Sequence, residues 1–179
     1  MVKEKVLISK GFLKIKMVEY DKNKSHYVVV TGILVKDGKY LIAKRAEWEK
    51  AFPGKWTVPG GKLEMKDYIS REKDTSAHWY NIFENLLRRE IMEEVGLEIK
   101  NIGYVTSMVY LRDDGIPCII VSLYAEPVGE KIKLCNALTE FEWVILDEAK
   151  NYDMVEGLYE ELEILDNHLK SGGNMVWGN

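Results

Sequence analysis

The sequence predicts a mixed α/β domain built from layers of sheet and helix. Several apolar segments are rich in valine, isoleucine, tyrosine and tryptophan, which favour strands, and two further segments are expected to be helices. Turn sequences join neighbouring strands directly, so antiparallel hairpins replace a regular alternation of strand and helix. Because 46% of the 179 residues are hydrophobic, we expect one domain over residues 1–179, with an N-terminal extension at about 1–24.

The expected strands form two hairpins and one further strand. They cover residues 27–35, 39–43, 103–111, 116–125 and 141–146. The segment Lys36-Asp37-Gly38 lies between the first two and carries the Asp-Gly signal of a tight hairpin turn. Residues 113–117, Asp-Asp-Gly-Ile-Pro, supply turn residues between the next two. We therefore expect each of these pairs to be antiparallel.

Two helices are expected, over residues 79–95 and 155–170. The second is amphipathic, because an apolar residue recurs every three or four positions and should face the core. This stripe consists of Leu158, Leu162, Leu165 and Leu169. Gly172-Gly173 follows the stripe and should end the helix, since glycine readily adopts the left-handed conformation found just beyond helix ends.

Composition and charge exclude several classes of function. The net charge of −4 provides no basic surface of the kind that a nucleic acid polymer requires, although it allows a single nucleotide held through a metal ion. No segment approaches the roughly 18 consecutive apolar residues of a spanning helix, so no membrane partner is expected. The two cysteines are Cys118, in an apolar run where a small buried thiol is common, and Cys135. We expect a cytoplasmic protein.

The end of the first helix is the most informative segment, because Glu90, Glu93 and Glu94 follow an apolar run there. At about 100° per residue, their bearings from Leu86 are about 40°, about −20° and about 80°, on the apolar side of the helix. Carboxylates so close together repel one another and lose hydration, and a divalent cation is the natural compensation. A solvated acidic patch is the alternative explanation. Gly96 ends the helix sharply, which places the acids at a fixed junction.

A second unusual segment, Pro59-Gly60-Gly61, lies upstream of this helix. The two glycines allow main-chain groups to approach a ligand closely, because neither carries a side chain. Taken alone, such a segment is a common turn. It gains meaning from the acidic helix that follows it.

The two segments together resemble the signature of the Nudix hydrolases. In that signature a glycine, five residues, a glutamate and seven residues precede Arg-Glu, an aliphatic residue, any residue, Glu-Glu, any residue, glycine and an aliphatic residue. Gly61 opens the match, and its second half is complete at residues 89–97. Two departures occur: Asp67 replaces the first glutamate, and 14 additional residues, 68–81, precede Arg89. The resemblance covers residues 27–170 and implies a Nudix-like mixed-sheet sandwich with helices packed on both sides.

The resemblance also implies a magnesium site, in which Mn²⁺ is a candidate substitute for Mg²⁺. The implied ligands are the carbonyl of Gly60 and the carboxylates of Glu90, Glu93 and Glu94, which are the oxygen ligands that magnesium prefers. Glu90 and Glu93 are implied to be catalytic, and the sequence does not assign which glutamate deprotonates the attacking water. Arg89 would orient the glutamates through its planar guanidinium. Asp67 keeps the charge of the glutamate it replaces and would support them.

The implied reaction is hydrolysis of a diphosphate linkage in a nucleotide, which depends more on charge stabilisation than on covalent catalysis. A nucleoside triphosphate is favoured by the Phe-Pro-Gly-Lys-Trp segment at 52–56, with a nucleotide sugar or ADP-ribose as alternatives. Arg45 and Lys62 are expected to bind the substrate through its phosphates. Glu140 is a further candidate for substrate binding, and the resemblance implies that it or Glu142 adds a metal ligand from the opposite loop. Trp56 is expected in the core rather than stacked on a base. A homodimer is the expected assembly.

Other interpretations stay open at this point. Asp67 and the insertion also suit a non-catalytic Nudix-like module that binds a nucleotide or a protein, although such a module has no reason to keep three repelling acids together. A relative of isopentenyl diphosphate isomerase is a third interpretation, which lacks a supporting cysteine and glutamate pair. The inserted residues 68–81 either form a lid over the substrate or a longer loop before the helix.

Overall fold

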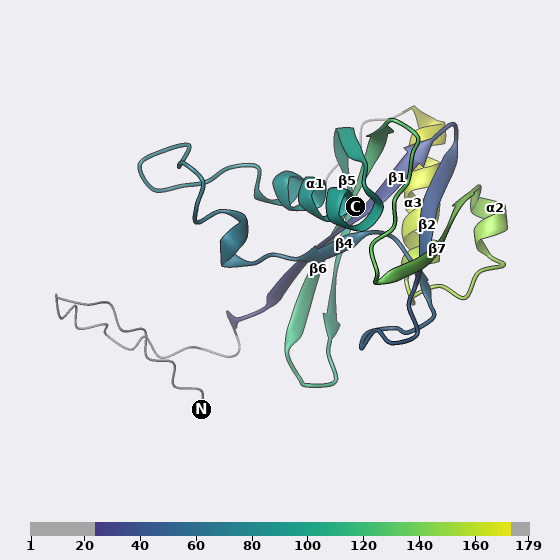
Figure 1. Cartoon of the computed structure of the whole chain (residues 1–179), viewed down its shortest axis with the longest axis horizontal. Helices are drawn as coiled ribbons and strands as arrows, with labels where there is room; N and C mark the ends of the chain where they lie inside the picture. Colours follow the sequence, from purple (N-terminus) through teal and green to yellow (C-terminus); the bar gives the residue numbers. More distant parts are fainter. Residues whose placement is uncertain (1–23, 173–179) are drawn as a thin grey trace.

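The computed structural model describes residues 24–172 of the chain, which form a sheet assembly with helices on both sides (Figure 1). The elements in chain order are β1 (Tyr27–Lys36), β2 (Lys39–Arg45), β3 (Trp56–Thr57), β4 (Gly60–Lys62), the 3₁₀ helix η2 (Met65–Asp67), α1 (Ile82–Val95), β5 (Glu98–Leu111), β6 (Pro117–Val128), β7 (Leu138–Val144), α2 (Leu146–Ala149) and α3 (Leu158–Ser171). The extension expected at about 1–24 lies outside the described residues, apart from Lys24.

Strand β1 is the centre of the sheet assembly, because its two ends pair with different neighbours. The strand order is β3-β2-β1-β6-β5, with β4 also paired to β1 and β7 also paired to β2. The first eight residues of β1 run parallel to β6, whereas its last two form the predicted hairpin with β2. The other pairings are antiparallel. The mixed sheet predicted from the sequence is therefore confirmed.

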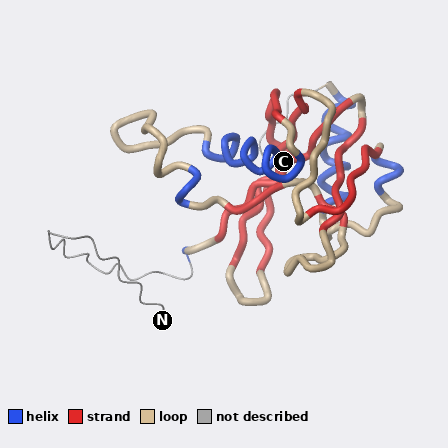
Figure 2. The backbone as a smooth tube through the Cα atoms, in the orientation of Figure 1, coloured by secondary structure: helices blue, strands red, loops and turns tan. Residues whose placement is uncertain are grey.

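The two long helices cover opposite sides of β1, as the tube in Figure 2 shows. Leu87 and Ile91 of α1 belong to a core cluster that includes Val30 of β1. Leu162 of α3 belongs to a second cluster, which includes Ile33 of β1. Since successive side chains of a strand point to opposite faces, one strand supplies both cores.

The predicted hairpin turns and helix ends at glycine are confirmed, whereas Gly60 and Gly61 lie in strand β4 rather than in a turn. Asp37 and Gly38 both have positive φ angles, 51° and 71°, which are the angles required by a hairpin turn whose twist matches its strands. Gly96 and Gly172 follow α1 and α3 in the left-handed conformation, with φ of 70° and 61°. Gly115 lies in the turn that joins the antiparallel strands β5 and β6.

Both long helices begin three residues later than predicted. Asn81, just before α1, has a positive φ of 54°, and the residues before it belong to the inserted loop. Gly157, with φ of 87°, separates Val155 from α3. The apolar stripe is also shorter than predicted: Leu158, Leu162 and Leu165 are buried, whereas Leu169 is 40% exposed because the helix extends past the sheet it covers. Within residues 24–172, no helix is long and apolar enough to cross a membrane.

The inserted residues 68–81 form a loop that projects from the body of the domain beside α1 (Figure 1). Contacts between residues of this loop stabilise its conformation. The ring of Trp79 lies 5.3 Å from that of Tyr68, and its Nε1 donates a hydrogen bond to the carbonyl oxygen of Arg71 at 3.1 Å. The main-chain N–H of Tyr80 donates to the carboxylate of Asp74 at 2.9 Å.

Candidate active site

The segment Pro59-Gly60-Gly61 leads into β4, which runs along β1 and directly contacts α1. The main-chain N–H of Gly60 donates a hydrogen bond to Glu94 Oε2 at 2.9 Å. At Gly61, a Cβ atom would lie 2.0 Å from Glu90 Oε1, closer than non-bonded atoms can approach. Two acids of α1 therefore contact the main chain of β4, and a side chain at position 61 would displace the Glu90 carboxylate from the space it occupies.

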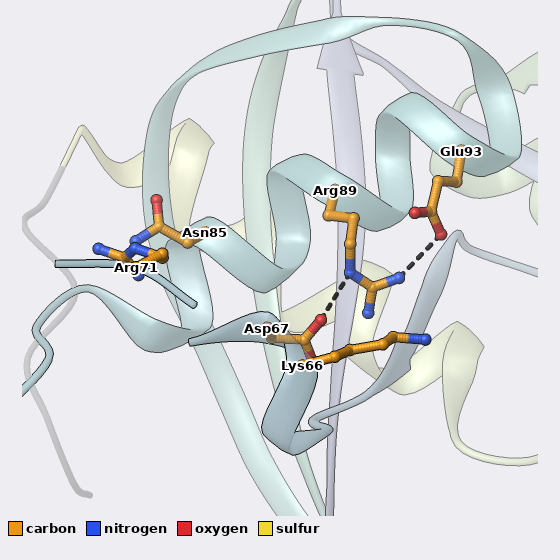
Figure 3. A pocket seen from close by; sticks show the side chains of 6 residues that line it. All are labelled: Lys66, Asp67, Arg71, Asn85, Arg89 and Glu93. Carbon is orange, nitrogen blue, oxygen red and sulfur yellow. Dashed lines mark hydrogen bonds and ion pairs between the residues drawn. The ribbon is translucent and has the colours of Figure 1, made fainter. Parts of the chain in front are cut away.

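Arg89 connects the acids of α1 to the segment that follows β4. Its guanidinium lies 2.6 Å from Glu90 Oε1, 2.8 Å from Glu93 Oε2 and 2.9 Å from Asp67 Oδ1. The first of these is the shortest, and Figure 3 shows Arg89 between Asp67 and Glu93. The contact with Asp67 is close but lacks hydrogen-bond alignment, so it is an ion pair. A planar cation with several donors can hold three carboxylates at once.

Asp67 reaches Arg89 despite the insertion. Its carboxylate is only 6% exposed, and Oδ2 accepts a hydrogen bond from the main-chain N–H of Glu64 at 2.7 Å. The 3₁₀ helix η2 ends at Asp67, and α1 begins at Ile82. The additional residues 68–81 therefore lie between these two elements, after the residue that contacts Arg89. An insertion placed there extends a surface loop and does not displace the two elements it joins.

The three glutamates of α1 differ in burial, which corrects the prediction that all of them share the apolar face. Glu90 is 9% exposed and Glu94 is half-buried, whereas the side chain of Glu93 is 58% exposed. The prediction was centred on Leu86. The completely buried Ile91 lies about 140° from Leu86, so the centre of the buried face is turned away from Glu93.

Burial also changes the charge state of these acids. It raises the pKa of Glu94 to about 7, although the hydrogen bond from Gly60 acts in the opposite direction. Burial likewise raises the pKa of Glu90, against the effect of the adjacent Arg89. Two carboxylates that lose hydration beside one arginine lack full compensation for their charge. A site of this kind is suited to a further cation.

The donor chemistry of these residues fits a divalent cation, although their present arrangement is not a formed metal shell. Among the described residues, no three acidic, histidine or cysteine side chains converge as metal ligands. Glu90 and Glu93 contact Arg89, while Glu94 contacts the Gly60 N–H. The set nevertheless offers only oxygen donors, which is the preference of magnesium and manganese. The loss of hydration that raises the pKa of Glu90 and Glu94, despite their contacts with Arg89 and the Gly60 N–H, is the feature that favours a cation here.

A cavity of about 300 Å³ adjoins the two glycines. It is lined by Val29, Thr31, Arg45, Ala51, Phe52, Thr57, Val58, Gly60, Gly61, Lys62, Met108, Tyr110, Arg112, Cys118, Ile120, Val155, Glu156, Leu158 and Glu161. Its walls thus come from β1, β4, β5, β6, α3 and the loop after β2. None of these lining residues belongs to the inserted loop, so in this structure the loop does not close the cavity as a lid.

Arg45 and Lys62, predicted to bind substrate, both line this cavity. Arg45 also holds its own loop, since its Nε donates to the carbonyl oxygen of Ala51 at 2.7 Å and its Nη2 lies 3.1 Å from Glu49 Oε2. The ammonium of Lys62 lies over the ring of Tyr27, 5.4 Å from its centre. The two cations are therefore beside the glycines, where phosphate oxygens could reach them.

Glu140, unlike Arg45 and Lys62, does not line the cavity. It lies on strand β7 rather than in a loop, directly opposite Lys44 of β2. The two side chains form an ion pair of 2.8 Å, and that of Glu140 is 55% exposed. The strand register, which the sequence does not reveal, determines this pairing. Trp56 is in the core as predicted: it is 9% exposed, and its ring meets that of Tyr152 edge-on at 4.8 Å.

The inserted loop adds one charged residue near α1. Lys66, Asp67, Arg71, Asn85, Arg89 and Glu93 line a shallow hollow, shown in Figure 3. Arg71 lies beside Asn85 in this view, apart from the group formed by Arg89, Asp67 and Glu93. The hollow therefore borders the carboxylate site on the side of Glu93.

Reasoning from the sequence missed Glu161, which lines the cavity and is 8% exposed. The helical periodicity of the sequence nevertheless contained a signal for this residue. Counting about 100° per residue, Glu161 lies about 60° from Leu158 and next to Leu165, so it borders the apolar stripe of its helix. An acid in that position is unusual because burial of a charge costs free energy unless it is compensated.

Comparisons with known proteins agree with this geometry. The family model described as the NUDIX domain matches residues 26–163. The nucleoside triphosphatase NudI of Escherichia coli is 26% identical over 137 residues, which are 70% of this chain and 86% of the relative. The solution structure of the E. coli ORF135 protein has a TM-score of 0.63 at 23% identity and covers 86% of this chain and 97% of its own.

A further solved structure is the NUDIX domain of Shewanella oneidensis NrtR, which was crystallised with ADP ribose. Its TM-score is 0.63 at 16% identity, and the match covers 84% of this chain and 94% of that domain. At such identities, a structural likeness shows the fold alone.

Proposed function

The chain belongs to the NUDIX domain family and is a Nudix hydrolase, and we propose that it hydrolyses a diphosphate linkage of a nucleoside triphosphate with the help of Mg²⁺. The observation that carries the proposal is the position of Glu90 and Glu94. Glu90 is buried and Glu94 is half-buried, and they contact the main chain at Gly61 and Gly60, beside a cavity lined by Arg45, Lys62 and Arg112. This arrangement brings negative charge, main-chain donors and phosphate-binding cations to one place.

Each residue has a role in this proposal. Glu90, Glu93 and Glu94, with the Gly60 carbonyl, would hold Mg²⁺, or Mn²⁺ in its place. The ion would neutralise phosphate oxygens and lower the pKa of the attacking water. Arg89 holds Glu90 and Glu93 in position, and Asp67 in turn holds Arg89. Glu90 and Glu93 are the candidates for accepting a proton from the water.

The substrate preference has support from one relative. NudI is described as a nucleoside triphosphatase, and this chain covers most of its length. The NrtR domain binds ADP ribose, so ADP-ribose and nucleotide sugars stay as alternative substrates. The non-catalytic alternative is set aside, because the chain is a Nudix hydrolase that retains all three acids of α1. The cytoplasmic location, the homodimer, the single domain and the absence of a nucleic acid polymer as partner stay predictions from the sequence.

The test is a panel of nucleoside triphosphates, nucleotide sugars and ADP-ribose, assayed for phosphate or pyrophosphate release with Mg²⁺ and with EDTA. Glu94→Gln should lower kcat on the best substrate by on the order of 10²-fold or more, since it removes a charge that holds the cation. Glu84→Gln is the matched control, because Glu84 lies on the same helix and is exposed. A folded Glu94→Gln enzyme with an unchanged rate would contradict the proposal.

A further inference from the structure

Three buried polar groups without hydrogen-bond partners gather on the α3 side of β1. They are Thr31 Oγ1, Ser122 Oγ and Glu161 Oε2. Thr31 and Ser122 are directly paired across the parallel strands β1 and β6, so their side chains leave the sheet on the same face. Ser122 is completely buried, and Glu161 of α3 is 8% exposed. Most buried polar groups in folded proteins are hydrogen-bonded, so three orphans at one place require an explanation.

Two of the three groups lie at the cavity already described, whereas Ser122 is completely buried and is not part of its lining. Thr31 and Glu161 line it, together with Gly60 and Gly61. Thr31 is also paired with Gly60 across β1 and β4. A molecule in the cavity can therefore reach the glycines of the carboxylate site and the Glu161 carboxyl at the same time.

The remaining walls of the cavity suit a flat heterocycle. Val29, Met108 and Ile120 provide apolar surface, and Phe52 and Tyr110 add two partly exposed rings that lie 6.5 Å apart. A mostly apolar cavity with a few polar groups at one place is the usual form of a site for a small organic ligand. The apolar walls would contact the ring faces, and the polar groups would contact the ring edge.

Within residues 24–172, Glu161 forms no ion pair with a cation. Burial raises the pKa of its carboxyl, and the nearby hydroxyl of Ser122 reduces this rise without forming an aligned hydrogen bond. Arg45 also lines the cavity but is held by Ala51 and Glu49. A ligand with two adjacent N–H donors would satisfy both carboxylate oxygens, as the guanidinium of arginine does in a two-pronged pair.

We propose that Glu161, with the hydroxyl of Thr31, binds the edge of a guanine base, so that the substrate of this hydrolase is a guanine nucleotide. The inference rests on the proposed function for the identity of the ligand as a nucleotide. The guanine edge presents one acceptor, O6, followed by two donors, N1–H and the 2-amino group. Its complement is one donor and two acceptors, which a hydroxyl and a carboxylate supply. Adenine and cytosine present a ring nitrogen acceptor beside the amino group, and uracil presents a second carbonyl oxygen, so each places an acceptor against the carboxylate.

The test compares guanine with hypoxanthine, which lacks only the 2-amino group. Equilibrium binding of GMP and IMP is measured by calorimetry with Mg²⁺, and kcat/KM is measured with GTP and ITP. The unmodified protein should favour each guanine nucleotide by at least about fivefold, the effect expected of a two-pronged base contact. In Glu161→Gln, an amide N–H₂ faces a base donor, so the preference should fall below about twofold while IMP binding stays within about threefold.

Glu163→Gln is the matched control, because Glu163 lies on the same helix, is exposed and should leave the preference unchanged. Glu161→Leu, an apolar replacement, should also abolish the preference, and thermal unfolding confirms that each variant is folded. Equal binding of GMP and IMP, no binding of GMP at millimolar concentration, or an unchanged preference in folded Glu161→Gln would overturn the proposal and leave Glu161 as a residue bound to interior water. GMP binding needs no hydrolysis, so failure of the proposed function is seen separately, as the absence of Mg²⁺-dependent phosphate release.

Discussion

The two long helices each bury acids, but the acids of α1 and α3 are compensated in different ways. On α3, Asp166 accepts a hydrogen bond from the Tyr40 hydroxyl at 2.9 Å and lies 2.6 Å from the ammonium of Lys170. Burial alone would raise the pKa of Asp166, yet these two partners hold it below its ordinary value. On α1, burial dominates and the pKa values of Glu90 and Glu94 are raised.

This difference distinguishes acids that stabilise the folded state from acids whose charged form is destabilised by burial and is suited to binding a ligand. A carboxylate whose partners favour its charged form stabilises the folded state, whereas one whose burial disfavours that form destabilises it until a cation or donor arrives. Asp166 belongs to the first kind, and Glu94 belongs to the second. Glu161 is on the same helix as Asp166 but resembles Glu94, because burial raises its pKa too.

The largest effect on activity is expected at Arg89. Replacing this arginine with lysine keeps the positive charge and changes the geometry of the side chain. In Arg89→Lys, a compact ammonium cannot contact Asp67, Glu90 and Glu93 at once, so the acids would no longer be held in position. We expect Mg²⁺-dependent kcat to fall by about 10- to 100-fold, as is usual for residues that orient metal ligands. Steady-state kinetics over a Mg²⁺ titration measures this. Arg88→Lys, on the neighbouring exposed position, is the control, and equal kinetics for the two variants would contradict the role of Arg89.

A second prediction concerns the pH dependence of stability without metal. The pKa of Glu94 rises from 4.5 to about 7 on folding, so the folded state binds the proton more tightly than the unfolded state. The stabilisation from the protonated carboxyl is complete below about pH 4.5 and is lost as pH rises through about 7. Relative to Glu94→Gln, the unmodified protein in EDTA should lose on the order of 2 kcal/mol of unfolding free energy over this range.

Urea unfolding of both proteins at pH 5 and pH 8 measures that difference, and the comparison with Glu94→Gln removes the contribution of other titrating groups. Adding Mg²⁺ at pH 8 should restore stability to the unmodified protein and have less effect on the variant, since ligands that bind the folded state stabilise it. Parallel pH profiles of the two proteins would show that Glu94 is not destabilising in its charged form.

The smallest effect is expected at Tyr40, which donates a hydrogen bond to Asp166, and it concerns the unfolding free energy. Tyr40→Phe removes the hydroxyl that donates to Asp166 but keeps the buried ring, and Lys170 still contacts the carboxylate. The unfolding free energy should fall by about 1 kcal/mol, the net contribution of one buried hydrogen bond. Chemical denaturation provides the measurement, and nucleotide hydrolysis should be unchanged. A large loss of activity would mean that α3 positions the catalytic residues more directly than its contacts indicate.

Much of the site was predictable because its residues belong to motifs whose members lie close together along the chain. The complete second half of the signature at residues 89–97, with the glycines upstream, identified the family, and a helical count placed Glu90 and Glu94 toward the core. The same count failed for Glu93, since it could not show that Ile91 rather than Leu86 lies nearer the centre of the buried face. The position of Asp67 was in doubt from the sequence, and only its contact with Arg89 shows that the insertion leaves it in place.

The sequence by itself determined the hairpin at Asp37-Gly38, the ends of α1 and α3 at glycine, and the presence of an acidic helix downstream of two consecutive glycines. These features depend on residues close together along the chain, whose conformational preferences and periodicity are readable locally. The tertiary structure alone decided that Glu140 of β7 pairs with Lys44 of β2 and that Glu161 and Thr31 line the same cavity. Those arrangements depend on strand register and on which face of α3 covers β1, and both result from long-range packing that no local pattern encodes.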